Sequence, residues 1–79
     1  MASDPIEIDA LGMRCPIPVK LTRKALKEIP EGDAIQLIGD DPESLHDIPA
    51  LLERLGLVPP EISSSEGFWR YLIRNEKRS

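Results

Sequence analysis

The stretch Arg14-Cys15-Pro16-Ile17-Pro18 joins a short alternating segment to a helical pattern and indicates where the first helix begins. Each proline fixes its own φ near the helical value and lacks an N–H group, so it is tolerated in a helix's first turn. We therefore expect a helix to begin at Cys15. The sulfur would then lie at the positive end of the helix dipole, beside unpaired N–H groups and the guanidinium of Arg14. Each of these favours thiolate, the nucleophilic form of cysteine, so the stretch predicts an activated sulfur.

On both sides of this stretch, the apolar residues are spaced as in a small α/β domain. Ile6 and Ile8 alternate with acidic residues, which predicts a strand with one buried face. From Pro16 to about Ile29 the spacing is helical, and the turn residues 30–33 end the helix. The expected apolar stripe of this helix consists of Ile17, Leu21, Ala25, Leu26 and Ile29.

The next segments predict a second strand and a second helix. A nearly continuous apolar run at 34–38 is typical of an interior strand. A helix is expected over about 44–55, where Ser44 with Asp47 resembles a capping box. Gly56 suits the left-handed position that closes many helices.

The last third of the chain predicts a hairpin. Residues 58–62 could form a strand at an edge or a bulge, because Pro59 and Pro60 cannot donate to an interior ladder. A polar turn at 63–67 leads to residues 68–74, which are rich in strand formers. Trp69, Tyr71 and Ile73 share one face of this strand and Phe68, Arg70, Leu72 and Arg74 the other, and the sequence leaves open which face is buried.

The expected element order is therefore βαβαββ, an α+β fold in which two helices cover one face of a four-stranded mixed sheet. The first β-helix-β crossover should be right-handed, which gives a two-layer sandwich. We expect residues 1–79 to form one domain, with an ordered core at about 5–74 and a frayed polar tail at 75–79. Cys15 would lie at the carboxyl end of the first strand, where open α/β sheets usually hold ligands.

The residue counts exclude several classes of protein. With one cysteine, the chain has no internal disulfide, no Cys-x-x-Cys pair and no cysteine-rich zinc site. A signal peptide and a membrane-spanning run are not seen, so the reducing cytoplasm is the expected compartment. The single histidine, His46, has no ligands at zinc spacing. Turn formation and capping explain the acidic residues Asp40, Asp41, Glu43 and Asp47, so we expect no metal and no organic cofactor.

The charges are unevenly distributed. The net charge is −4, which disfavours a dedicated nucleic-acid binder. No Lys or Arg occurs from Glu28 through Glu53, whereas basic residues follow one helical face after Cys15. This basic face is either a solvated surface or a docking patch for an acidic partner, and it consists of Lys20, Arg23, Lys24 and Lys27.

Three segments of the chain resemble the TusA (SirA-like) sulfur carriers. The run from Asp9 to Pro18 is similar to their Cys-Pro-x-Pro signature. Asp40-Asp41-Pro42 followed by Asp47-Ile48-Pro49 resembles the segment that leads into their second helix. Arg70-Tyr71-Leu72-Ile73-Arg74 resembles their last strand, so the similarity extends from about Asp9 to Arg74.

This resemblance implies a βαβαββ fold and a cytoplasmic carrier in which Cys15 forms a persulfide. The implied donor is a cysteine desulfurase or a rhodanese-like sulfurtransferase, and the implied acceptor is a DsrE-like relay protein. The best-known role of the family is in tRNA 2-thiouridine synthesis, while other members serve sulfur oxidation or molybdenum-cofactor synthesis. Arg14, Pro16 and Pro18 would shape the helix start, and Arg14 either steadies the sulfur anion or is solvated.

Two other functions remain open from the residues alone. One is a module that binds RNA or a regulatory protein through the basic helix and the open sheet, with Cys15 as a redox reporter. The acidic net charge and the missing aromatic RNA-binding signature disfavour it. The other is a thiol oxidoreductase, for which the chain has no resolving cysteine.

Overall fold

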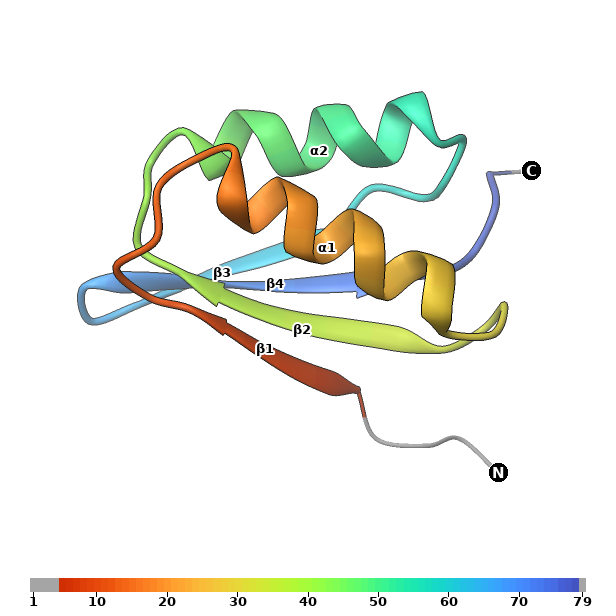
Figure 1. The fold of residues 1–79 in the computed structure, drawn as a ribbon, viewed down its shortest axis with the longest axis horizontal. Coiled ribbons are helices and arrows are strands. Elements are labelled where there is room, and N and C mark those ends of the chain that lie inside the picture. Colours follow the sequence, from red (N-terminus) through yellow and green to blue (C-terminus); the bar gives the residue numbers. More distant parts are fainter. Residues whose placement is uncertain (1–4, 79) are drawn as a thin grey trace.

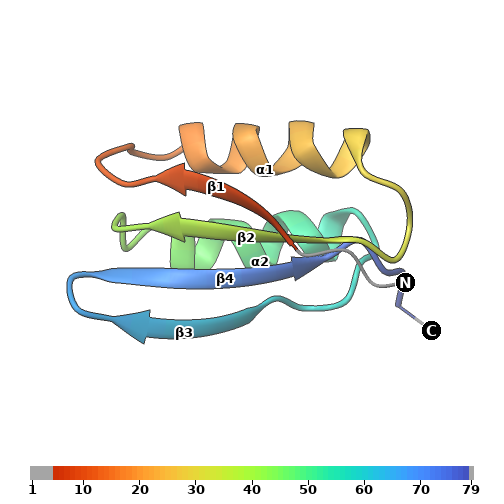
Figure 2. The ribbon, with the colours of Figure 1, turned by 90° about the horizontal axis from the view of Figure 1, so that it is seen from below.

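Two helices lie on one face of a four-stranded sheet in the computed structural model of the chain, which describes residues 5–78 (Figure 1). The elements are β1 (Ile6–Ala10), α1 (Ile17–Glu28), β2 (Ala34–Gly39), α2 (Ser44–Arg54), β3 (Glu61–Ser65) and β4 (Phe68–Arg74). Seen from below, α2 lies behind β2 and β4 and α1 lies along the β1 side, and no helix among residues 5–78 covers the near face of the sheet (Figure 2). The expected order and α+β class are confirmed. No helix in residues 5–78 is long and apolar enough to cross a membrane.

The strand order β1-β2-β4-β3 determines which loops meet. β1 pairs in parallel with β2, while β4 pairs antiparallel with both β2 and β3. In the parallel pair, Ala10 lies opposite Gly39, so both strands end at the same edge of the sheet. The loop after β1 and the loop after β2 therefore lie side by side, and Cys15 lies in the first of them.

The core fills the space between the sheet and the helices. From β2 and β4 it includes Ile35, Leu37, Tyr71 and Ile73, and from α2 it includes Leu52; all five are fully buried. Trp69 packs against the same core. The face of β4 that carries Trp69, Tyr71 and Ile73 is therefore the one that faces the helices, which the sequence alone did not decide. Each fully buried aliphatic side chain here contributes about 1.5–3 kcal/mol to the burial free energy.

Helix α1 begins two residues later than expected, and its core-facing stripe includes the expected Ala25, Leu26 and Ile29 but not Ile17. It starts at Ile17, with Pro16 as the N-cap residue and Pro18 in the first turn. The expected start at Cys15 is wrong: Cys15 lies in the turn before α1, and its N–H is donated to Asp41 of the other loop. Ile17, expected in the apolar stripe, is 48% exposed, whereas Thr22 is fully buried and donates its hydroxyl hydrogen bond to the Pro18 carbonyl. A buried threonine can replace an apolar residue here because its polar group is satisfied within the helix.

The second helix agrees with the expected range. Gly56 has a φ of +76°, the left-handed conformation predicted for it. Pro49 lies inside α2, where its missing N–H cannot bond the preceding turn. The predicted capping box is wrong, however: Glu43 is the N-cap, no side chain caps the helix, and Ser44 is already its first residue.

The C-terminal third differs from the expectation in two places. β3 spans Glu61–Ser65 rather than 58–62, so Pro59 and Pro60 precede the strand and the hairpin turn shrinks to Glu66-Gly67. The expected frayed tail is also wrong for residues 75–78. Lys77 forms a bridge with Leu57, and Arg78 donates from its backbone N–H to the Gly56 carbonyl and from Nε to the Leu57 carbonyl. Ser79 lies outside the described residues.

Candidate functional site

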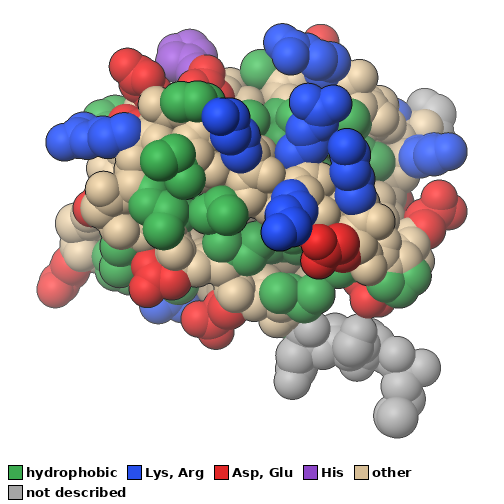
Figure 3. All heavy atoms as spheres, viewed as in Figure 1, with side chains coloured by type: hydrophobic (Ala, Val, Ile, Leu, Met, Phe, Trp, Pro, Cys, Tyr) green, Lys and Arg blue, Asp and Glu red, His purple; other side chains and the backbone are tan. Residues whose placement is uncertain are grey.

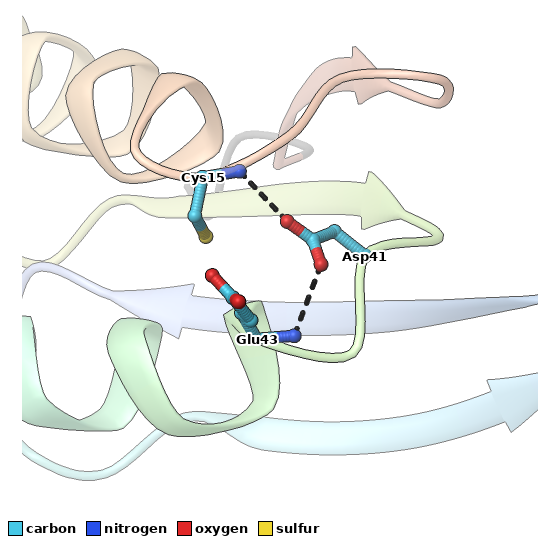
Figure 4. A group of neighbouring side chains, drawn as sticks. All are labelled: Cys15, Asp41 and Glu43. Carbon is cyan, nitrogen blue, oxygen red and sulfur yellow. Dashed lines mark hydrogen bonds between the residues drawn. The ribbon is translucent and has the colours of Figure 1, made fainter.

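Two aspartates join the loop after β1 to the loop after β2. Asp41 accepts the backbone N–H of Cys15 at Oδ2 over 2.7 Å and that of Glu43 at Oδ1 over 3.1 Å (Figure 4). Asp40 accepts the N–H of Gly12 over 3.0 Å. The three hydrogen bonds hold the cysteine loop against the start of α2.

Asp41 is the residue that organises this junction. Asp41 is only 4% exposed, and a carboxylate is rarely buried to this degree unless it has hydrogen-bond partners. The two backbone N–H groups, and more weakly the charge of Arg14, lower the pKa of its carboxyl below the ordinary value. The sequence predicted only a turn residue here. The available signal was an acidic pair directly after an interior strand, at the sheet edge that also holds Cys15.

The sulfur of Cys15 faces the first residue of α2. Its Sγ lies 3.3 Å from Oγ of Ser44, and the thiol is half-buried. Ser44 is itself 1% exposed, so its hydroxyl is directed into the molecule rather than to solvent. The sulfur therefore lies at the N-terminal ends of both helices, two residues before α1 and beside the first residue of α2.

The expected activation of the thiol is wrong in this geometry. Burial raises the pKa of Cys15 above its ordinary value, and the hydrogen bond between Cys15 and Ser44 opposes that shift. The Asp47 carboxylate and, more weakly, the negative charge of Asp41 raise the pKa further. The thiol form is thus favoured in the free protein.

The hydrogen bonds at the helix start explain why the prediction failed. The N–H of Cys15 is donated to Asp41, and the N–H of Ile17 is donated to the Arg14 carbonyl over 2.9 Å. Pro16 and Pro18 have no N–H to offer. These groups are therefore not available to the sulfur. The peptide bond between Cys15 and Pro16 is cis.

The predicted neighbours of Cys15 lie where the sequence placed them, but one acts on a different group. Pro16 and Pro18 flank the first turn of α1, and Pro18 is buried against the core layer. Arg14 is exposed, and its positive charge lowers the pKa of Asp41. Asp47, which the sequence assigned to helix capping, instead raises the pKa of the Cys15 thiol.

One sulfur and two carboxylates lie close enough together to resemble a metal site. Ligand atoms of Cys15, Asp41 and Glu43 all lie within 4.8 Å of one another (Figure 4). Both oxygens of Asp41 already accept backbone N–H groups, and Glu43 is exposed. The loop junction by itself accounts for this proximity, so we assign no metal.

The basic face of α1 extends away from this junction. Lys and Arg side chains gather over α1 on the face shown in Figure 3. The side chains of Lys20, Arg23, Lys24 and Lys27 are all exposed. Leu11 and Ile17, at the Cys15 end of the helix, are 45% and 48% exposed. An exposed apolar rim at the thiol and a basic face beside it are features that a partner protein could contact.

Comparison with known proteins identifies the family. The model of the family described as Sulfurtransferase TusA matches residues 6–75, which includes all six elements and the loop of Cys15. The chain belongs to the TusA family. It is also 36% identical over 69 residues to a protein of Archaeoglobus fulgidus whose curated name is that of a proposed sulfur carrier protein. That alignment covers 86% of this chain and 90% of the relative.

For this TusA-family chain, the comparisons support a role as a sulfur carrier. They agree with the resemblance carried by the Cys-Pro-x-Pro segment and by the two later motifs. Membership implies interaction with proteins that donate and accept sulfur, without naming them.

Proposed function

We propose that the chain carries sulfane sulfur as a persulfide on Cys15, in the manner of a sulfurtransferase that works as a carrier. The observation that carries this proposal is the position of Sγ, half-buried at the start of both helices and 3.3 Å from Ser44 Oγ. A loop held by Asp41 presents the sulfur at the sheet edge. No second cysteine in the sequence competes for it.

Loading is a thiol exchange that needs no net oxidation or reduction. The Cys15 thiol gives up its proton to solvent as Sγ attacks the outer sulfur of the donor persulfide. A new S–S bond forms while the donor S–S bond breaks, and its electron pair remains on the donor thiolate, which then takes up a proton. The products are a Cys15 persulfide and a donor thiol.

Release repeats the exchange in the opposite direction. An acceptor thiolate attacks the outer sulfur, and Cys15 leaves as a thiolate that recovers its proton. The hydroxyl of Ser44 stabilises this leaving thiolate, because its hydrogen bond lowers the pKa of Cys15. The raised pKa of the free thiol protects Cys15 from unwanted alkylation and oxidation between cycles.

The proposed partners follow from the family. The donor is a cysteine desulfurase or a rhodanese-like protein, and the acceptor is a DsrE-like relay protein. We place the pathway in cytoplasmic tRNA 2-thiouridine synthesis or another route of sulfur trafficking. The basic face of α1 would guide acidic partners to the sulfur.

Intact-mass spectrometry tests the proposal. The protein is incubated with a cysteine desulfurase and cysteine, and the expected product gains the mass of one sulfur atom, which dithiothreitol removes. The Cys15→Ser variant should gain none. A wild-type chain that gains no sulfur, or a variant that gains as much, would overturn the carrier function. Salt-sensitive RNA binding that survives Cys15→Ser would instead favour the regulatory module.

A further inference from the structure

Tyr71 has a buried hydroxyl that the fold does not use. The residue is fully buried in the centre of β4, and its Oη has no hydrogen-bond partner among residues 5–78. Leaving a buried hydroxyl without a partner costs free energy, whereas phenylalanine would fill the same space without that cost. The hydroxyl therefore needs an explanation that the packing of the core does not supply.

The position of Tyr71 connects it to the sulfur site. It lies on the helix-facing side of β4, opposite Leu37 of β2. Two residues further along β2, Gly39 ends the strand and the chain enters the loop of Asp41, which binds Cys15. Burial raises the pKa of Tyr71 to about 12, and the charges of Cys15 and Asp41 add to this shift, so the phenol lies within their electrostatic range.

Ser44 thus lies next to the thiol, and Tyr71 lies within electrostatic range of it, both on the inside of the molecule. Ser44 is 1% exposed and lies next to Sγ. Tyr71 is 0% exposed and has an unpaired donor. Both are buried polar groups beside the apolar side chains of the core, where Thr22 and Asp41 are also buried. A sulfur anion placed in this part of the core would find hydrogen-bond donors there without meeting water.

We propose that the Tyr71 hydroxyl donates a hydrogen bond to the outer sulfur of the Cys15 persulfide and holds that sulfur retracted against the core between loading and release. The inference rests on the proposed function. The persulfide extends the cysteine by one S–S bond of about 2.05 Å, which brings a second sulfur toward the interior. The phenol remains protonated at neutral pH and is therefore a donor throughout the cycle.

In this arrangement Tyr71 is a positioning residue that makes no hydrogen bond to Cys15 while the cysteine is in its thiol form. The hydrogen bond forms only when the outer sulfur is present, so it stabilises the loaded carrier over the empty one. Swinging the sulfur outward for transfer breaks it. The unpaired hydroxyl in the thiol form is the feature expected of a site prepared for an atom that arrives later.

Nuclear magnetic resonance tests this contact in the unaltered protein. Tyr71 is the only tyrosine in the chain, so protein labelled with ¹³C at the tyrosine ζ carbon gives one signal. Cys15 is loaded chemically with inorganic polysulfide, which makes the test independent of any desulfurase. We expect the signal to shift on loading and to return after dithiothreitol. An unchanged signal in fully loaded protein would overturn the contact.

The Tyr71→Phe variant tests the consequence and removes only the oxygen atom. The lifetime of the chemically loaded persulfide toward cyanide should shorten roughly tenfold, the factor expected for a lost hydrogen bond to a charged group. The gain in unfolding temperature on loading should also shrink, while the thiol form stays at least as stable as wild type. Equal lifetimes, or a stability change that is the same in the thiol and persulfide forms, would reduce Tyr71 to a core residue.

The two proposals fail differently. A chain that polysulfide loads but a desulfurase does not would contradict the proposed carrier function and leave the Tyr71 contact measurable. A chain that both reagents load, with no response at Tyr71, would contradict only the positioning role. If neither reagent loads Cys15, both proposals are wrong.

Discussion

The carboxylate of Asp41 accepts the backbone N–H of Cys15 over 2.7 Å, and through this bond the loop after β2 fixes the loop that carries the cysteine. The same carboxylate accepts the N–H of Glu43 at the start of α2. One buried acid therefore sets the position of the sulfur relative to both helices. The geometry of the candidate site depends on a residue separated from Cys15 by the whole of α1 and β2.

Replacing Asp41 with Asn should destabilise the fold in a pH-dependent way. The folded-state pKa of Asp41 is lowered from its ordinary value of 3.8, so the ionised form contributes stability above that value and loses it as the pH falls through the folded pKa. Thermal unfolding of wild type and Asp41→Asn should therefore differ at neutral pH and converge in acid.

The matched control for this prediction is Asp40→Asn. Asp40 makes a comparable bond to Gly12, but that bond is exposed and its loss should be less costly. A difference between wild type and Asp41→Asn that stays constant down to low pH would contradict the electrostatic role of Asp41.

Replacing Asp47 with Asn should make Cys15 more reactive. The Asp47 carboxylate raises the pKa of the thiol, so the amide should lower that pKa and increase the thiolate fraction at neutral pH. We expect the rate of alkylation by iodoacetamide to rise severalfold and its pH profile to move toward acid. Glu53→Gln, also on α2, is the control. A slower or unchanged rate in Asp47→Asn would show that this carboxylate does not act on the thiol.

Ser44→Ala should have the opposite effect on the same measurement. The hydroxyl of Ser44 lowers the pKa of Cys15, and its removal should slow alkylation at neutral pH and move the profile toward alkaline pH. The lost hydrogen bond should cost no more than about 1 kcal/mol of stability. Ser63→Ala, at an exposed position of β3, should leave both quantities as in wild type. Faster alkylation in Ser44→Ala would contradict the conclusion that this hydrogen bond lowers the pKa of Cys15.

The basic face of α1 should govern the rate of association with an acidic sulfur donor. Changing Lys20, Arg23, Lys24 and Lys27 to Gln should lower that rate on the order of tenfold at low ionic strength and flatten its salt dependence. Stopped-flow loading by the donor measures the effect. Arg70→Gln places the same kind of change on the open sheet face. An equal loss in this control, or no loss in the fourfold variant, would mean that the basic face is only a solvated surface.

The periodicity of the sequence was sufficient to predict the elements that are bounded by clear turn residues. Gly39 and the turn at 30–33 bound β2 and α1, and the structure has both elements close to the expected ranges. The wrongly predicted boundaries are those that lie next to prolines. β3 begins after Pro59 and Pro60, and α1 begins after Pro16. In each case the residues that follow the prolines make the first regular hydrogen bonds.

For the site, Cys15 could be found from sequence because proline, arginine and a strand end surround it locally. Its pKa could not. Local features point to a lowered value, whereas burial and the carboxylates of Asp47 and Asp41, on α2 and in the other loop, raise it, and Ser44 opposes them only in part. Local sequence does not contain the distance between two loops.

By itself, the sequence determined the element order, the family resemblance and the cysteine that is proposed to carry sulfur, because these depend on spacing and residue type along the chain. Only the tertiary structure decided which acids surround that cysteine and that the buried hydroxyl of Tyr71 has no hydrogen-bond partner among residues 5–78. The physical reason is the parallel pairing of β1 with β2, which brings two loops separated by a helix and a strand to the same edge of the sheet.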